Sequence, residues 1–247
     1  MRVRKSNILI GFIIMLCVAF TVFEFKQEYF LSQFFRGLIV PLFALLYFNN
    51  VKRRSFYFTW FLILYSISEL LVFSDLFFDF SKMTEAELLK FDDIYYTIGN
   101  TLYITAYIFL LIDVLRTIDL KMVFKNYKIH LIVLTALNIY IIDVLLNIVD
   151  SVVEGSYLYY IELIYNIVML LVLTTCLISY FYNDNKKSLF LFFGSICIVF
   201  SEVIQVAYYY ISDKDLLNFL QTFLFVLAFG FFHFQAKIRN KKVQFFA

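Results

Sequence analysis

Residues 53–73 read RRSFYFTWFLILYSISELLVF, and this stretch decides the class of the protein. Two arginines precede a nearly unbroken apolar run that is long enough to cross the roughly 30 Å hydrocarbon core of a bilayer as a helix. The apolar residues are continuous rather than alternating, which excludes a strand of a membrane barrel. Glu69 interrupts the run, and an ionisable residue inside a membrane span is a candidate functional group.

The composition of the whole chain places it in the same class. Of its 247 residues, 63% are hydrophobic and the mean hydropathy is +0.83, whereas soluble domains are about 45–50% apolar. The net charge of +2 does not indicate a nucleic-acid partner. Cys17, Cys176 and Cys197 lie in apolar runs without CxxC spacing, and the chain has only two histidines. We therefore expect neither a metal nor another cofactor.

Eight runs are candidate membrane spans. They cover residues 7–24, 34–49, 56–74, 95–115, 129–149, 157–182, 188–211 and 216–235. The first could instead be a signal peptide, but no A-x-A-like cleavage site follows it, so we interpret it as a helix that is retained. The second is the shortest and contains Pro41.

The basic residues indicate the direction of the spans. With the N-terminus in the cytoplasm, 16 of the 21 lysines and arginines fall in cytoplasmic segments, as the positive-inside rule requires. The other five are Lys26, Arg36, Lys82, Lys90 and Lys214. Seven spans would place the basic C-terminal tail outside, so the pattern favours eight spans with both termini cytoplasmic.

The chain also repeats part of itself. Shifted by 133 residues, RRSFYFTWFLILYSISELLVF aligns without gaps to KKSLFLFFGSICIVFSEVIQV, and Ser68-Glu69 falls on Ser201-Glu202. Each glutamate follows its basic end by about fourteen residues, or about 20 Å of helix. We therefore predict an all-α integral membrane protein of eight transmembrane helices, built as two parallel four-helix repeats in residues 1–120 and 121–247. In this arrangement the two glutamates lie at one depth.

Other polar residues are expected in the same outer half of the membrane. They are Asn100, Asp143 and Asn166, with Tyr103 and Tyr165 near the same level. Asp113 and Glu162 lie nearer span ends, so we expect them at the interfaces. Polar side chains in membrane bundles often serve only as hydrogen-bond partners between helices. We favour that role for Asn166, but a functional cavity for the pair of glutamates, because two buried carboxyls at one depth are costly.

The longest outer loop, residues 74–93, is acidic. Its segment TEAELLKF predicts a short amphipathic helix in which Thr84 and Glu87 have the spacing of a capping box.

The first half of the chain resembles the YhhN family of membrane lysoplasmalogenases, whose members have eight spans in a chain of similar length. Pro41 stands where the family has a proline in span two, with Val40 in place of the usual lysine. Ser68-Glu69 stands where the family has Gly-Asp, and Asn100 and Tyr103, in GNTLYI, stand where it has His-x-x-Tyr.

The second half extends the resemblance. Met169 stands in a span that contains methionine in the family, and GSICIVFSE, residues 194–202, follows the family motif Gly-x-x-x-F-x-x-Ser-Asp. Both family aspartates are thus glutamates here. The resemblance implies hydrolysis of the vinyl ether bond of lysolipids, which needs one carboxyl as proton donor and another as carboxylate.

The resulting candidate site has two groups of residues. The catalytic candidates are Glu69, Glu202, Asn100 and Tyr103, and the candidates for substrate binding are Ser68, Ser201, Asp143, Tyr165 and Asn166. The partner expected is a membrane lipid or lysolipid. A non-catalytic protein that binds lipids or small molecules, or a transporter, is the alternative. Residue usage rich in Phe, Ile, Tyr, Asn and Lys is typical of AT-rich genomes, and indicates the inner membrane of a bacterium.

Overall fold

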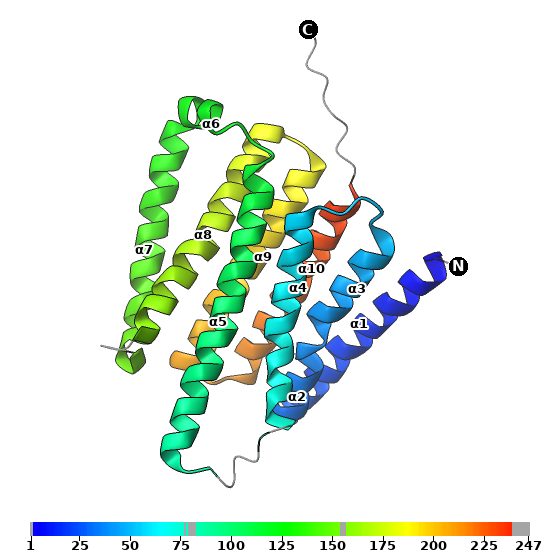
Figure 1. Cartoon of the computed structure of the whole chain (residues 1–247), viewed down its shortest axis with the longest axis vertical. Coiled ribbons are helices and arrows are strands. Elements are labelled where there is room, and N and C mark those ends of the chain that lie inside the picture. Colours follow the sequence, from blue (N-terminus) through cyan, green and yellow to red (C-terminus); the bar gives the residue numbers. More distant parts are fainter. Residues whose placement is uncertain (1, 77, 79–82, 154–156, 239–247) are drawn as a thin grey trace.

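The computed structural model describes residues 2–76, 78, 83–153 and 157–238 (Figure 1). All regular elements among these residues are helices, and eight of the segments are long and apolar enough to cross a membrane. The predicted all-helical membrane class and the predicted number of spans are therefore confirmed.

The helices follow each other along the chain with short connections. The first half holds α1 (Arg2–Phe25), α2 (Tyr29–Gly37), α3 (Ile39–Asn50), α4 (Phe56–Leu70), the 3₁₀ helix η1 (Leu71–Leu76) and α5 (Glu85–Leu115). The second half holds α6 (Leu120–Asn126), α7 (Lys128–Val153), α8 (Tyr157–Asn183), α9 (Lys186–Tyr210) and α10 (Asp215–Lys237). The short α6 lies outside the eight spans, and α2 and α3 together form the second span.

The second span is longer than the sequence predicts, and it is broken. Proline lacks an N–H group, and its ring clashes with the carbonyl four residues earlier, which for Pro41 is that of Gly37. The break falls there, between α2 and α3. Gly37 also lies close to α4, since a Cβ atom on it would be 3.0 Å from the Glu69 carbonyl oxygen and 2.8 Å from Val72 Cγ1. A glycine at this position lets the end of α2 approach the end of α4.

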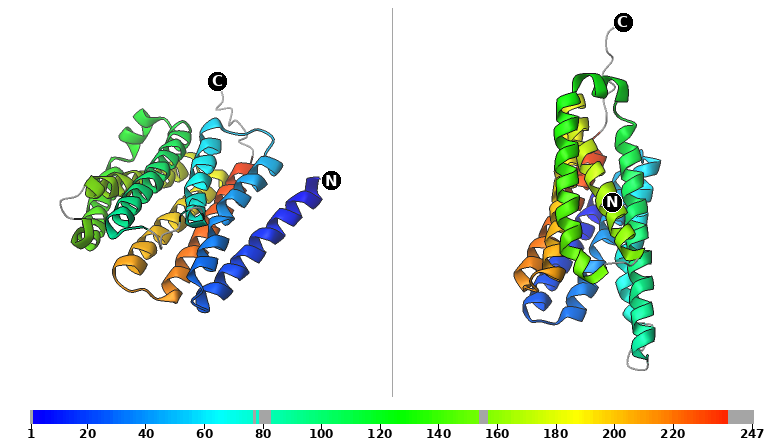
Figure 2. Two further views of the ribbon diagram at one scale, coloured as in Figure 1. Left: turned by 60° about the horizontal axis from the view of Figure 1, so that its bottom comes forward. Right: turned by 90° about the vertical axis from the view of Figure 1, so that its left-hand side faces the viewer.

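Helix α5 differs from the expected short loop helix followed by a span. It is one continuous helix of 31 residues that starts within the predicted loop. The capping box at its start is confirmed, because the backbone N–H and the hydroxyl of Thr84 both donate to Glu87 Oε2, at 2.9 and 2.8 Å. At about 1.5 Å per residue the helix exceeds the thickness of the apolar core, and it extends beyond its neighbours at one end of the bundle (Figure 2).

The bundle has α1 and α7 at opposite edges (Figures 1 and 2). Between them α4 packs on α5, α10 packs on α9, and α5 packs on α8. The start of α1 and the end of α10 lie at one end of the bundle, while α4 ends and α5 begins at the other (Figure 1).

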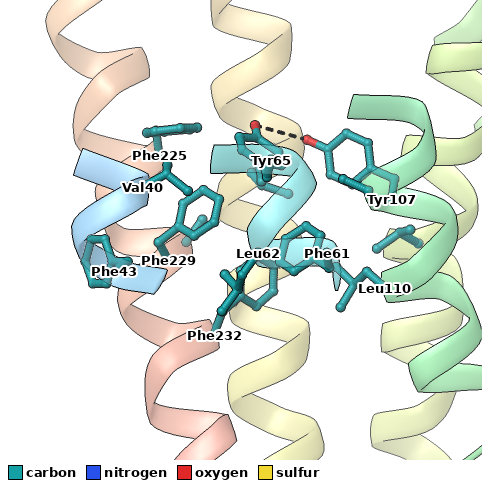
Figure 3. Close-up of a cluster of buried hydrophobic side chains, with 14 of the residues drawn as sticks. Val40, Phe43, Phe61, Leu62, Tyr65, Tyr107, Leu110, Phe225, Phe229 and Phe232 are labelled. Atoms are coloured by element: carbon teal, nitrogen blue, oxygen red, sulfur yellow. Dashed lines mark hydrogen bonds between the residues drawn. The ribbon is translucent and has the colours of Figure 1, made fainter. Parts of the chain in front are cut away.

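Aromatic side chains from α4, α5 and α10 fill the centre of the bundle (Figure 3). Phe61 stacks on Phe229 with ring centroids 6.1 Å apart, and it meets the edge of Phe232 at 5.5 Å. Tyr65 and Tyr107 complete the cluster on the side of the α4 C-terminus, with their hydroxyl oxygens 3.5 Å apart.

Candidate functional site

The two glutamates line one cavity of about 540 Å³. Its walls come mainly from α2, α4, α5, α8 and α9, with smaller contributions from η1 and α7, and Tyr65 belongs both to the cavity lining and to the aromatic cluster. Glu69 lies in the last turn of α4, and Glu202 lies in the second half of α9. The volume is within the usual range of small-molecule pockets, roughly 300–1,000 Å³.

Glu69 lies beside a cation. The Tyr103 hydroxyl donates to its Oε1 at 2.8 Å, and the guanidinium of Arg36 interacts with it electrostatically. The close approach of Gly37 to the end of α4 explains this placement, because it holds the preceding residue, Arg36, within electrostatic range of Glu69.

Glu202 is surrounded by phenols instead. Tyr65 and Tyr107 each donate to its Oε1 at 3.2 Å, and Tyr165 is a further close neighbour of the carboxyl. Tyr107 is fully buried. The Glu69 and Glu202 carboxyls therefore have different surroundings: Glu69 has a guanidinium and a phenol, and Glu202 has a group of phenols.

A helical spacing of four residues produces this arrangement. Residues four apart lie on one face of a helix, and this spacing relates Tyr65 to Glu69 on α4 and Tyr103 to Tyr107 on α5. The α4 and α5 tyrosines also touch, with the Tyr65 and Tyr103 rings 4.7 Å apart. A continuous set of contacts thus runs from Glu69 through Tyr103 and Tyr65 to Glu202.

Most of the predicted site residues lie at this cavity. Besides the two glutamates, the lining includes Ser68, Asn100, Tyr103, Tyr165 and Asn166. The Asn100 amide donates to the carbonyl of Tyr96 at 3.0 Å, one turn earlier on α5. The hydroxyl of Ser68 donates to the carbonyl of Gly99 at 3.0 Å, so it joins α4 to α5 as well as facing the cavity.

Two predicted residues lie elsewhere. Asp143 is exposed on the peripheral helix α7, which contributes Leu145 to the cavity. Depth along a helix does not determine which face a residue occupies, and Asp143 occupies the outer face. Ser201 is fully buried, and its hydroxyl donates to the carbonyl of Gln221 on α10 at 3.0 Å. It is thus an interhelical contact of the kind common in membrane bundles.

Glu162, expected near the interface, lies near the start of α8 and has a further role. It lines the cavity and accepts a hydrogen bond from the Tyr96 hydroxyl. Asp113, in contrast, lies at the far end of α5, where it accepts from the Ser55 hydroxyl, and it is not among the cavity residues.

Sequence reasoning missed Arg36, Tyr65 and Tyr107. It assigned Arg36 to a non-cytoplasmic segment, whereas this residue is 8% exposed and lines the cavity. One signal was present, because Arg36 stands within QFFRGLIVP, with apolar residues on both sides. For the tyrosines the signal was helical spacing, since Tyr65 stands four residues before Glu69 and Tyr107 stands four residues after Tyr103.

Within the described part of the chain, no three His, Cys, Asp or Glu side chains are grouped so that they could hold a metal ion. Comparison with models of known protein families, with curated proteins and with solved structures finds no match for this chain. The geometry of the cavity therefore carries the functional argument.

Proposed function

We propose that this protein is a membrane hydrolase that cleaves the vinyl ether bond of single-chain lysolipids, with Glu69 and Glu202 as its catalytic carboxyls. One observation carries the proposal: both carboxyls line the same cavity, and their surroundings differ. Pairs of carboxyls in unlike environments divide the roles of acid and base in many hydrolytic enzymes.

The reaction consumes one water. One carboxyl donates its proton to the vinyl carbon that is not bonded to the ether oxygen, and the other vinyl carbon becomes an oxocarbenium-like centre. Water adds to that centre and returns a proton to the site. The hemiacetal then breaks its bond to the original ether oxygen, which leaves an aldehyde and the glycerol-based alcohol. No step requires an oxidant or any substrate other than the lysolipid and water.

The surroundings suggest which glutamate has which role. We assign the carboxylate role to Glu69, because the adjacent Arg36 guanidinium stabilises negative charge there. We assign proton donation to Glu202, whose Oε1 is held by Tyr65 and Tyr107, so that Oε2 can carry the proton. Asn100 and Tyr103 would position water or the substrate oxygen from the α5 wall.

We also make a proposal about the family of this protein and about its internal repeat. We infer a divergent member of the YhhN family, with two parallel four-helix halves and both termini cytoplasmic, in a bacterial inner membrane. The contact of α4 with α5 corresponds to that of α9 with α10, and α5 with α8 corresponds to α10 with α3. The hydroxyls of the aligned Ser68 and Ser201 make matching bonds to Gly99 and Gln221. These correspondences support the repeat.

The second candidate is a non-catalytic binding protein or transporter of the same architecture. One feature favours it: Asn100 stands where the YhhN family has a histidine. Unlike a histidine, an amide does not exchange protons, so it cannot serve as an acid or a base. Under this alternative the cavity would bind a lysolipid, and the lipid would remain intact.

Aldehyde release from a purified lysoplasmalogen separates the two. We expect the protein, reconstituted in lipid nanodiscs, to release aldehyde, and each of Glu69→Gln and Glu202→Gln to lower the rate by about 10²–10⁴-fold, the usual contribution of acid–base catalysis. Glu85→Gln is the matched control, since Glu85 is exposed at the start of α5, and its activity should be unchanged. No release by the unaltered protein, or release that both cavity substitutions leave intact, would overturn the proposal.

A further inference from the structure

Arg36 is a buried cation whose hydrogen bonds are incomplete. It is 8% exposed in the last turn of α2, and its Nε has no acceptor within the described structure. A guanidinium has five N–H donors and stays protonated in proteins. One donor reaches Gln33, where Nη1 lies 3.3 Å from Oε1. Buried donors are normally paired, so an unpaired one calls for an explanation.

The cavity supplies the space for a missing acceptor. Arg36 and Gln33 both line it, and so do Glu69, Glu162 and Glu202. The guanidinium packs against α10, since the Arg36 Cζ lies 5.5 Å from the centre of the Phe225 ring, and the neighbouring Gly37 packs against α4. A planar guanidinium at a cavity wall is suited to bind an oxyanion through two parallel hydrogen bonds.

We propose that Arg36 binds the oxyanion of a single-chain amphiphile, a phosphodiester or a carboxylate, and so fixes the position of the ligand in the cavity. The assignment rests on the proposed function in one respect, namely that this cavity takes such an amphiphile. Nε itself is buried, so an oxyanion in the cavity would first meet the terminal amino groups of Arg36, and a small rotation of the guanidinium would let it contact Nε as well and satisfy the donor that the protein leaves unpaired.

The charges facing the cavity are compatible with this role. Arg36 interacts with Glu69 electrostatically and donates a hydrogen bond to Gln33, so a ligand oxyanion can use other donors of the guanidinium. Glu162 is hydrogen-bonded to the Tyr96 hydroxyl, and Glu202 is bonded to the tyrosines at the opposite wall. Arg36 is a positioning residue in this account, because it orients the ligand and takes no part in bond cleavage.

Equilibrium binding to the full-length protein in nanodiscs of neutral lipid tests the assignment. The probes are a saturated alkyl-ether lysophospholipid, which has no vinyl ether to cleave, the matching alkylglycerol without phosphate, and a fatty acid of the same chain length. We expect the unaltered protein to bind at least one anionic probe about tenfold or more tightly than the alkylglycerol. Whichever anionic probe binds identifies the oxyanion as a phosphodiester or a carboxylate.

Variants then test whether Arg36 causes the tighter binding of the anionic probe. Arg36→Gln should remove the preference for the anionic probe and leave alkylglycerol binding unchanged, while Arg36→Lys should keep part of it. Arg53→Gln, at an exposed arginine, should keep all of it. Equal binding of the three probes by the unaltered protein would overturn the assignment without any variant, as would a preference that survives in Arg36→Gln. Neither result depends on aldehyde release, so the hydrolase proposal and this one fail separately.

Discussion

Tyr107 shows most clearly how a single residue outside the cavity can orient a proposed catalytic carboxyl. Its hydroxyl donates to Glu202 Oε1 at 3.2 Å, but the residue is fully buried and does not line the cavity. We expect Tyr107→Phe to lower kcat for aldehyde release by roughly 10- to 100-fold, because Glu202 becomes a carboxylate as it gives up its proton, and a hydrogen bond to a charged group contributes about 1.5–3 kcal/mol. KM should change little, since Tyr107 does not face the ligand.

Steady-state kinetics checks this prediction. Tyr47→Phe is the matched control, because Tyr47 is equally buried and is bonded to Thr59 at 3.3 Å, outside the cavity. If Tyr47→Phe lowers kcat as much as Tyr107→Phe does, or if Tyr107→Phe raises KM alone, Tyr107 does not orient Glu202.

Single residues also show where sequence reasoning ends. The pairing of Glu69 with Glu202 was visible, because a Ser-Glu match inside two spans is unlike the surrounding apolar matches. The place of Arg36 at the cavity was not visible, although apolar residues flank it in the sequence. Its burial depends on the break before Pro41 and on the close contact of Gly37, and both involve packing between helices. Asp143 is exposed on α7 and does not line the cavity. Assigning a span predicts how deep a residue lies along its helix, but not which face of the helix it occupies.

The packing of α9 on α10 depends on Gly194. A Cβ atom at this position would lie 2.5 Å from two ring atoms of Phe232 and 3.2 Å from the carbonyl of Ala228. We expect Gly194→Ala to destabilise the protein by about 1–3 kcal/mol, the usual result of overpacking. Gly230→Ala, on α10, meets nothing within 4 Å and should be neutral or slightly stabilising, since alanine favours a helix over glycine by about 0.5–1 kcal/mol.

Thermal unfolding in detergent compares the two alanine variants. Gly194→Ala should unfold at a lower temperature than the unaltered protein, and Gly230→Ala should not. Equal unfolding temperatures for all three would mean that α9 and α10 are not packed as closely as the structure has them.

Helices were predicted well where composition alone defines them. Long apolar runs with basic ends indicated eight spans, and the Thr84–Glu87 spacing located the start of α5. The continuity of α5 through the predicted loop was missed, because its polar first turns look like a loop helix in a hydropathy profile. The break between α2 and α3 was signalled by Pro41, but its position relative to α4 required the structure.

The molecule as a whole brings Glu69 and Glu202, from the two halves of the chain, to a shared cavity. Glu69 comes from α4 and Glu202 from α9, and the tyrosines of α4 and α5 lie between them. The membrane class follows from composition, but the cavity does not, because its walls combine helices from both halves of the chain. If the two carboxyls form one catalytic unit, neither half of the chain has an independent site.

A double-substitution cycle on aldehyde release tests this claim most directly. Rates would be measured for the unaltered protein, Glu69→Gln, Glu202→Gln and the double variant, at equal amounts of folded protein. Residues that act as one unit give strongly non-additive losses, so the double variant should be about as slow as the slower single variant. Losses that multiply in the double variant, or a double variant as active as the unaltered protein, would contradict the account.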